Sequence, residues 1–164
     1  MKQLLVVVVL SLVLVVISQA PVAGQAPSIE GTNSLVARDL PDGTRIEPPA
    51  LDGLLTYTKT FRNFNIYWKD AEGKTTSIST IRKYALTADG YSETNIFHMA
   101  NDEIGGMGMT YDFSQVSGGS SVNIEDGKIE FDLPLFDEPH VVFEGDKLSA
   151  SVEGEFVDHW ERVE

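Results

Sequence analysis

The chain of 164 residues contains no cysteine. This absence excludes a disulfide framework, a thiol nucleophile and an anchor built on a lipid-modified cysteine. The fold must therefore be stabilised by burial of apolar surface. A domain of about 140 residues buries roughly two-thirds of the surface of its unfolded chain, which is enough for one self-sufficient core. The sequence has no internal repeat and no long low-complexity linker, so we expect one domain.

Positive charge is scarce in this chain. Lysine and arginine together number 12, aspartate and glutamate 25, and the formal net charge is -13. A surface this acidic repels phosphate backbones and anionic lipid headgroups, so nucleic acid is not an expected partner. The charge favours a role in solubility outside the cytoplasm, and a cationic partner is the alternative.

The sequence also lacks an apolar run long enough to cross a bilayer. Residues 4–17 are apolar almost throughout, but about fourteen residues fall short of the roughly twenty that a spanning helix needs. Lys2 precedes this run, and small and polar residues follow it. This order is typical of a secretory signal peptide.

The cleavage position follows from the small residues and prolines after the apolar run. Pro21 and Pro27 lie directly after Ala20 and Ala26, where a proline ring fits poorly into an extended protease site. We therefore predict cleavage after Gly24. The domain boundaries that follow are 1–24 for the signal peptide and 25–164 for a secreted or periplasmic product without stable membrane insertion. A leader that stays uncleaved and tethers the same domain is the alternative.

No segment after residue 24 has the 3.6-residue apolar period of an amphipathic helix, whereas a period of two is common. Phe64, Ile66 and Trp68, for example, share one face of a segment whose other face is polar. Similar alternation runs through residues 75–86, 91–100, 129–133, 140–144, 148–152 and 156–163. Pairs typical of tight turns separate these segments: Asp42-Gly43, Asp52-Gly53, Glu72-Gly73, Asp89-Gly90, Asp126-Gly127 and Gly145-Asp146.

Roughly eight to ten short strands joined mainly by hairpins predict an all-β fold. The two candidates are an up-and-down antiparallel β-barrel and a sandwich. The barrel is preferred because closure removes exposed strand edges, which a fold without disulfides would otherwise have to protect. Pro48-Pro49 and residues 118–121 are predicted to be irregular connections, and residues 25–30 a short mobile lead-in.

Short motifs along the chain resemble the lipocalin-like domain family of calycin-type β-barrels. Residues 31–36 resemble its first strand, residues 53–57 its Gly-x-x-x-Tyr pattern, and Trp160-Glu161-Arg162 its closing Trp-x-Arg. The chain is thereby similar to a small exported member of bacterial type over about residues 30–164. The resemblance implies a barrel with an internal cavity for a small apolar molecule, but no particular activity.

One position departs from the family pattern. Asn33 stands where the family usually has the tryptophan that closes one end of the barrel. We expect Trp160 or Trp68 to fill that space, with Arg162 available to stack on an indole.

No catalytic or metal-binding motif stands out. His98, His140 and His159 are far apart and lack the spacing of metal ligands, so no metal and no cofactor is predicted. Residues 123–127 lack the acidic ligands of a calcium loop and indicate a hairpin turn. Residues 105–109 are glycine-rich but lack the Gly-Lys-Ser/Thr ending of a phosphate loop.

Aromatic and charged residues supply the candidate ligand site. Inward-facing aromatic residues would form apolar walls with a few hydroxyl groups, as in many small-molecule sites. Met107 and Met109 either line such a wall or lie where glycines let a strand bend, and the bend is preferred. The predicted ligand-binding residues are Tyr57, Trp68, Arg82, Tyr84, Glu93, Phe97, Met107 and Met109.

Arg82 and Glu93 flank the Asp89-Gly90 turn and each has the parity of aromatic neighbours. If they face inward, their burial requires that they pair, and the pair would orient the polar end of a ligand. If they face outward, they form a modest cross-strand surface pair. The outward orientation is the preferred interpretation.

Three functions are compatible with these features. The first is an exported, non-catalytic barrel that binds a small hydrophobic molecule. The second is an isomerase or cyclase of the same shape that uses a tyrosine and an acid such as Glu93 or Asp112. The third is a protein-binding module of the cell envelope that uses the acidic exterior and the strand faces.

Overall fold

The computed structural model describes residues 28–163, and every regular element in this range is a β-strand. The predicted signal peptide and its cleavage position lie outside the described residues. The strands are β1 (Gly31–Asp39), β2 (Arg45–Ile46), β3 (Leu51–Tyr57), β4 (Phe61–Lys69), β5 (Thr75–Leu86), β6 (Gly90–Asp102), β7 (Gly108–Asp112), β8 (Ser117–Glu125), β9 (Lys128–Asp132), β10 (His140–Glu144), β11 (Lys147–Val152) and β12 (Phe156–Arg162). Within residues 28–163 there is no helix that could span a membrane.

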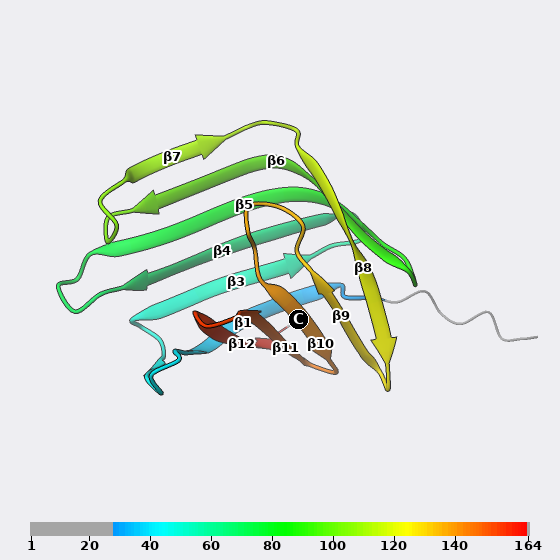
Figure 1. The fold of residues 1–164 in the computed structure, drawn as a ribbon, viewed down its shortest axis with the longest axis horizontal. Helices are drawn as coiled ribbons and strands as arrows, with labels where there is room; N and C mark the ends of the chain where they lie inside the picture. Colours follow the sequence, from blue (N-terminus) through cyan, green and yellow to red (C-terminus); the bar gives the residue numbers. More distant parts are fainter. Residues whose placement is uncertain (1–27, 164) are drawn as a thin grey trace, which may run out of the picture.

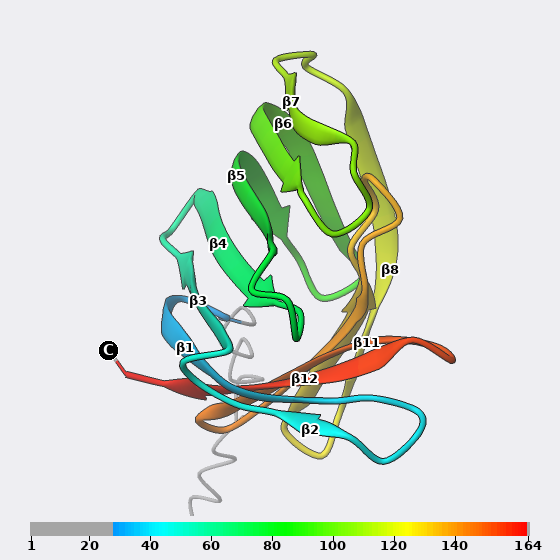
Figure 2. The same cartoon turned by 90° about the vertical axis from the view of Figure 1, so that its left-hand side faces the viewer.

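Ten of the twelve described strands close an antiparallel β-barrel (Figures 1 and 2). Each strand pairs with the next along the chain, except that the short β2 and β7 lie beside β1 and β6. The barrel closes where β1 pairs with β12 as well as with β3. This architecture confirms the predicted all-β antiparallel barrel of eight to ten strands.

The period of two in the sequence places alternate side chains inside the barrel. In β4, Arg62 and Ile66 are buried and Phe64 and Trp68 are half-buried, while Asn63 between them is exposed. The predicted common face of Phe64, Ile66 and Trp68 is confirmed. Because Arg62 has the same parity, a charged side chain also points into the barrel.

Most of the predicted turns lie between strands. Asp126 and Gly127 both have positive φ, 50° and 83°, in the hairpin between β8 and β9, a conformation that favours glycine. Pro48-Pro49 lies in the predicted connection, between β2 and β3. Two predictions are wrong: Asp52-Gly53 lies inside β3, and residues 118–121 lie inside β8.

Both errors have the same physical reason, which is close approach within the barrel rather than a turn. A Cβ at Gly53 would lie 2.7 Å from the backbone oxygen of Asn65 and 3.1 Å from the ring of Trp160. A Cβ at Gly118 would lie 2.9 Å from the Leu135 side chain. At each position glycine leaves room for a neighbouring segment.

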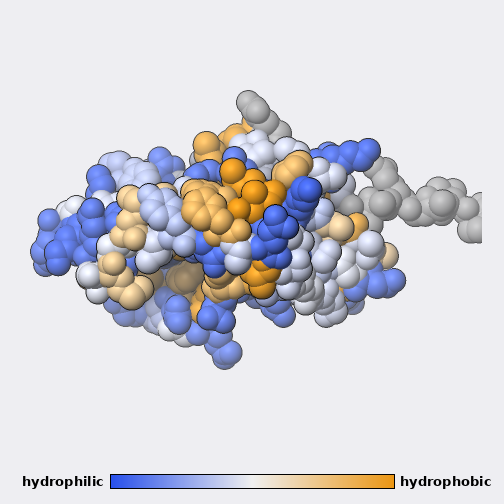
Figure 3. All heavy atoms as spheres, turned by 90° about the horizontal axis from the view of Figure 1, so that it is seen from above, coloured by the Kyte–Doolittle hydropathy of each residue, from blue (hydrophilic) through white to orange (hydrophobic). Residues whose placement is uncertain are grey.

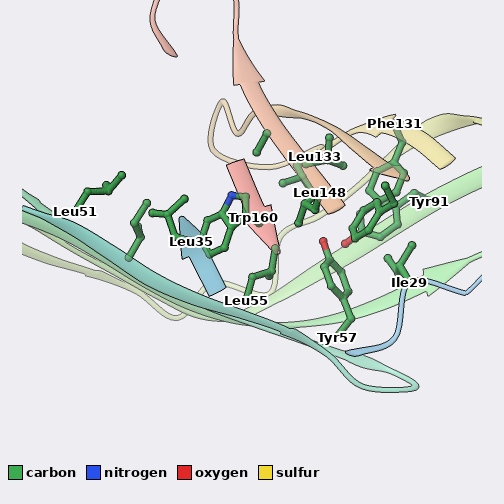
Figure 4. Close-up of a cluster of buried hydrophobic side chains, with 14 residues drawn as sticks. Ile29, Leu35, Leu51, Leu55, Tyr57, Tyr91, Phe131, Leu133, Leu148 and Trp160 are labelled. Carbon is green, nitrogen blue, oxygen red and sulfur yellow. The ribbon is translucent and has the colours of Figure 1, made fainter. Parts of the chain in front are cut away.

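Aromatic side chains fill one end of the barrel. The rings of Tyr91 and Phe131 stack at 4.1 Å, and Tyr57 meets the ring of Tyr84 edge-on at 5.2 Å. Figure 4 shows Tyr57, Tyr91 and Phe131 gathered on one side of the core, together with Ile29. Ile29 is 1% exposed, so the prediction of a mobile lead-in is wrong for the residue that anchors the start of the described chain.

Candidate functional site

A cavity of about 430 Å³ occupies the part of the barrel that the aromatic end leaves unfilled. This volume falls within the range of about 300 to 1,000 Å³ that is typical of small-molecule sites. The walls are mainly apolar and come from strands on all sides of the barrel: Leu55, Phe64, Ile66, Trp68, Ile78, Leu133, Val141, Ala150, Val152, Phe156 and Trp160.

The cavity approaches solvent between the β11–β12 turn and the β9–β10 loop. Glu155 of that turn and Phe136 and Asp137 of that loop are exposed lining residues. The lining residues Arg62 and Trp160, in contrast, are each 2% exposed. The cavity therefore has a rim, formed by the turn and the loop, and a buried inner end.

A buried ion pair lies beside the wall nearest the rim. Arg38 of β1 donates two hydrogen bonds to Asp158 of β12, from Nε at 2.6 Å and from Nη2 at 2.8 Å. The Arg38 guanidinium also lies 4.1 Å from the ring centre of Phe156 and 4.9 Å from that of Trp68. The two charges cancel, and the planar guanidinium is held between aromatic faces.

Four charged side chains form a second cluster at the inner end. Arg82 donates from Nη1 to Glu93 at 2.7 Å, and from Nη1 and Nη2 to Glu138 at 2.8 and 2.6 Å. Arg62 donates from Nη1 to Glu93 at 3.2 Å and to Glu138 at 2.7 Å. The side chains of Arg82 and Glu93 are 0% exposed. We call Arg62, Arg82, Glu93 and Glu138 the inner charge cluster.

The inner charge cluster is electrically balanced, with two guanidinium groups and two carboxylates. Burial by itself raises the pKa of Glu93, but Arg62 and Arg82 outweigh that effect, and its pKa lies below the usual range. Tyr91 also donates a hydrogen bond to Glu93, while burial raises the pKa of Tyr91 well above its usual value. Glu93 is therefore ionised and Tyr91 protonated at neutral pH.

The β9–β10 loop, residues 133–139, supplies the fourth member of the cluster. Leu133 and Leu135 are buried and anchor the loop, whereas Phe136 and Asp137 have positive φ, 58° and 52°. This conformation is uncommon for residues with a side chain, above all for phenylalanine. It turns Glu138 back towards the barrel interior, where its side chain is 11% exposed.

His98 of β6 borders the same loop. Its ring stacks on Phe136 with centroids 4.6 Å apart, and its Nδ1 is buried without a protein partner. Burial, together with the positive charge of Arg82, lowers the pKa of His98, and the charges of Glu138 and Asp112 oppose this only partly. The imidazole is therefore neutral at pH 7.

Two hydrogen-bond donors around the cavity have no protein partner. They are Nε1 of Trp160 and Nε of Arg62, both buried in residues that line the cavity. Buried polar groups are nearly always hydrogen-bonded, so unpartnered donors in a cavity wall point to a ligand or solvent acceptor. The wall thus combines a large apolar area with a few donors.

Three of the eight residues predicted from the sequence lie in or beside this site. Trp68 lines the cavity, and Arg82 and Glu93 form the inner charge cluster behind it. Tyr57 and Tyr84 belong to the aromatic end instead, where the Tyr84 hydroxyl donates to the backbone oxygen of Thr58 at 2.6 Å. The preferred outward orientation of Arg82 and Glu93 is wrong: they are buried and paired, which was the alternative.

The other three predicted residues lie outside the cavity. Met107 and Met109, in the β6–β7 region, are 76% and 55% exposed. Phe97 does not line the cavity; its ring packs on that of Phe113, with the ring centroids 5.7 Å apart. Seen from above in Figure 3, apolar residues gather on the face where β7 and the β7–β8 connection lie. Phe113, which precedes β8, is 68% exposed. The methionines are therefore part of an external apolar surface.

The sequence reasoning missed Arg62, Glu138, Arg38 and Asp158. Arg62 could have been found, because it has the same parity as Phe64, Ile66 and Trp68. Glu138 carried no signal, because it lies in a loop without periodicity.

The structure also shows which tryptophan lies next to Asn33. Asn33 pairs with Arg162 in the β1–β12 ladder and Leu35 pairs with Trp160, so Trp160 lies one inward-facing position from Asn33. Trp160 is 2% exposed, whereas Trp68 is half-buried near the rim. Of the two tryptophans, Trp160 therefore fills the space next to Asn33. Arg162 stacks on neither indole among the cation–π contacts of residues 28–163.

Within residues 28–163, no group of three or more histidine or acidic side chains is arranged to hold a metal ion. Comparison of the chain with protein-family models, with curated proteins and with solved structures gives no match. The function is therefore inferred from the site itself.

Proposed function

We propose that this chain is an exported, lipocalin-like protein that binds a small, mainly apolar molecule in its barrel. The observation that carries the proposal is the cavity of about 430 Å³, with apolar walls and a charged, buried inner end. Apolar walls with a few placed polar groups are the usual composition of a small-molecule site. The signal peptide predicted for residues 1–24 supports export, and the short motifs near both ends of the domain support the family.

The inner charge cluster favours binding over catalysis. A general acid or base needs a pKa near the working pH, whereas Glu93 is held ionised by two arginines and Tyr91 is held protonated by burial. Asp112 does not line the cavity. The alternative of a barrel-shaped isomerase or cyclase is therefore less well supported, because neither Glu93 nor Asp112 is suited to act as its acid or base.

A cavity-filling substitution tests the proposal. Ala150 lines the cavity, and Ala150→Phe would place a ring inside it. We expect a fluorescent apolar probe to bind the unmodified protein and to bind Ala150→Phe at least tenfold more weakly. Native mass spectrometry of gently purified protein should detect a small bound molecule.

The matched control is Ala85→Phe, the same change on an exposed position of β5. This variant should bind the probe as the unmodified protein does, and thermal unfolding should show that both variants fold. Equal probe binding by all three proteins, or none by any, would contradict the proposal.

A protein-binding surface is a second candidate function, because one face of the described barrel is apolar and exposed. Met107, Met109, Tyr111 and Phe113 are all more than half exposed on or beside β7. β7 pairs with β6 on one side only, which leaves the backbone groups of its other edge available to a further strand. A photo-crosslinker at Tyr111 would capture a partner from the cell envelope, and an equivalent crosslinker at Ala85 should not.

A further inference from the structure

The two arginines of the inner charge cluster lie side by side on neighbouring strands. Arg62 of β4 is directly opposite Arg82 of β5 in the ladder, and both side chains point into the barrel. Like charges placed opposite each other are destabilising unless anions lie between them. The pair therefore forms a site for carboxylates at the inner end of the cavity.

The barrel wall supplies only one of the two carboxylates that this site holds. Glu93 is part of β6, pairs with Tyr84 in the sheet and is hydrogen-bonded by Tyr91. Glu138 comes from the β9–β10 loop, and its side chain is part of the cavity lining. Without Glu138 the remaining three groups would carry one net positive charge.

The second half of the β9–β10 loop, which carries Glu138, is less firmly anchored than the first half. Leu133 and Leu135 hold the first half of the loop in the core, but Phe136 is 41% exposed. Phe136 and Asp137 both have left-handed backbone conformations, which are strained for residues other than glycine. Release of Glu138 would relieve this strain while the two leucines stay buried.

We propose that the ligand of this cavity is an amphiphile with a carboxylate head, and that its head replaces the carboxylate of Glu138 on Arg62 and Arg82. The inference rests on the proposed function, because the apolar tail would occupy the cavity walls along Phe64 and Ile66. Glu138 is then an internal stand-in for the ligand head.

The geometry favours a carboxylate over other head groups. Both oxygens of Glu138 accept hydrogen bonds from the two terminal nitrogens of Arg82, at 2.8 and 2.6 Å, which is the planar two-point contact that a carboxylate makes. A single negative charge restores the balance of the cluster, whereas a doubly charged phosphate would exceed it. A cationic head would face the two arginines, which are buried and held in the sheet.

The test compares four probes with the same twelve-carbon tail, measured by calorimetry below the concentration at which they form micelles. Dodecanoate should bind more tightly than dodecanol, dodecyl phosphate or dodecyltrimethylammonium. In Glu138→Gln the internal competitor is weakened, so dodecanoate affinity should rise about tenfold while dodecanol affinity stays the same. The matched control is Glu153→Gln, which removes an exposed carboxylate of the β11–β12 turn that does not line the cavity and should leave the preference unchanged.

A second measurement uses the unmodified protein and does not depend on the folding of a variant. Hydrogen exchange in residues 134–139 should increase when dodecanoate binds and should not increase with dodecanol. Equal affinity for dodecanoate and dodecanol, or loop exchange that ignores the head group, would overturn this inference and leave the binding function standing. Failure of all four probes to bind would instead count against the proposed function itself.

Discussion

Replacement of Glu93 by glutamine should destabilise the protein strongly, because Glu93 joins three buried donors. Its carboxylate accepts from Arg82 at 2.7 Å, from Arg62 at 3.2 Å and from the hydroxyl of Tyr91. Glutamine keeps the shape but turns an NH₂ group towards one of these donors and removes the charge. Two guanidinium groups then face the single carboxylate of Glu138.

The magnitude follows from the cost of removing one partner from a buried ion pair, about 3–5 kcal/mol. The free energy of unfolding of a single domain is about 5–15 kcal/mol in total, so the loss is a large fraction of it. For a domain of this size the thermal midpoint should fall on the order of 10 °C. The loss should shrink at acidic pH. The depressed pKa of Glu93 contributes stability above the usual glutamate range, and that stability disappears as the pH falls through the depressed value.

Urea unfolding followed by tryptophan fluorescence measures this loss, with the slope checked for a change in the unfolded state. The control is Glu161→Gln, on an exposed position of β12, which should change the free energy by about 0.5 kcal/mol or less. The double variant Arg82→Gln/Glu93→Gln should lose less than the sum of the single losses, because the two residues are in direct contact. If Glu93→Gln were as harmless as Glu161→Gln, the description of the inner charge cluster as a buried ionic network would be refuted.

Three other substitutions test the close packing at Gly53, the buried pair of Arg38 with Asp158, and the neutral imidazole of His98. Gly53→Ala should lower the free energy of unfolding in urea by about 1–3 kcal/mol, because its Cβ would lie 2.7 Å from a backbone oxygen of β4. Gly90→Ala is the control and should cost clearly less, because the nearest atom to its Cβ, the backbone oxygen of Ser120, would be 3.7 Å away. Asp158→Asn should cost about 3 kcal/mol, the lower end for a broken buried pair, because Arg38 keeps its two aromatic neighbours; no loss of thermal stability would contradict this. The pKa of His98 is lower in the folded protein than in the unfolded chain, so the unfolded chain takes up the proton first and the free energy of unfolding falls below about pH 6.5. His98→Asn should therefore make this fall less steep. An unchanged dependence of stability on pH would refute this reasoning.

The strands and most turns could be predicted because they depend on local properties of the chain. A period of two specifies a strand wherever one face is buried, and an Asp-Gly pair such as Asp126-Gly127 adopts the positive φ of a hairpin turn without outside help. Closure into a barrel followed from the number of strands and the need to protect their edges. The turn predicted at Gly53 was wrong, because the sequence does not distinguish a glycine needed for close packing from a glycine needed for a turn.

The candidate site could be predicted only in part. Trp68, Arg82 and Glu93 were expected near a ligand. The period of two assigns residues to two faces of a strand, but it does not show which face is buried when charged and aromatic residues lie on the same one. Charged residues are costly to bury alone, so the outward interpretation of Arg82 and Glu93 was physically reasonable. The missing information was the presence of compensating partners.

The amino-acid order alone predicts an acidic, cysteine-free, all-β chain whose strands and hairpins follow from alternation and turn chemistry. The burial of Arg62, Arg82 and Glu93 is instead a property of the closed barrel. It depends on Glu138, which reaches them from a loop more than forty residues away from Glu93. Strand patterns encode the interactions of neighbours, whereas a buried charge cluster depends on side chains that only the closed barrel brings together.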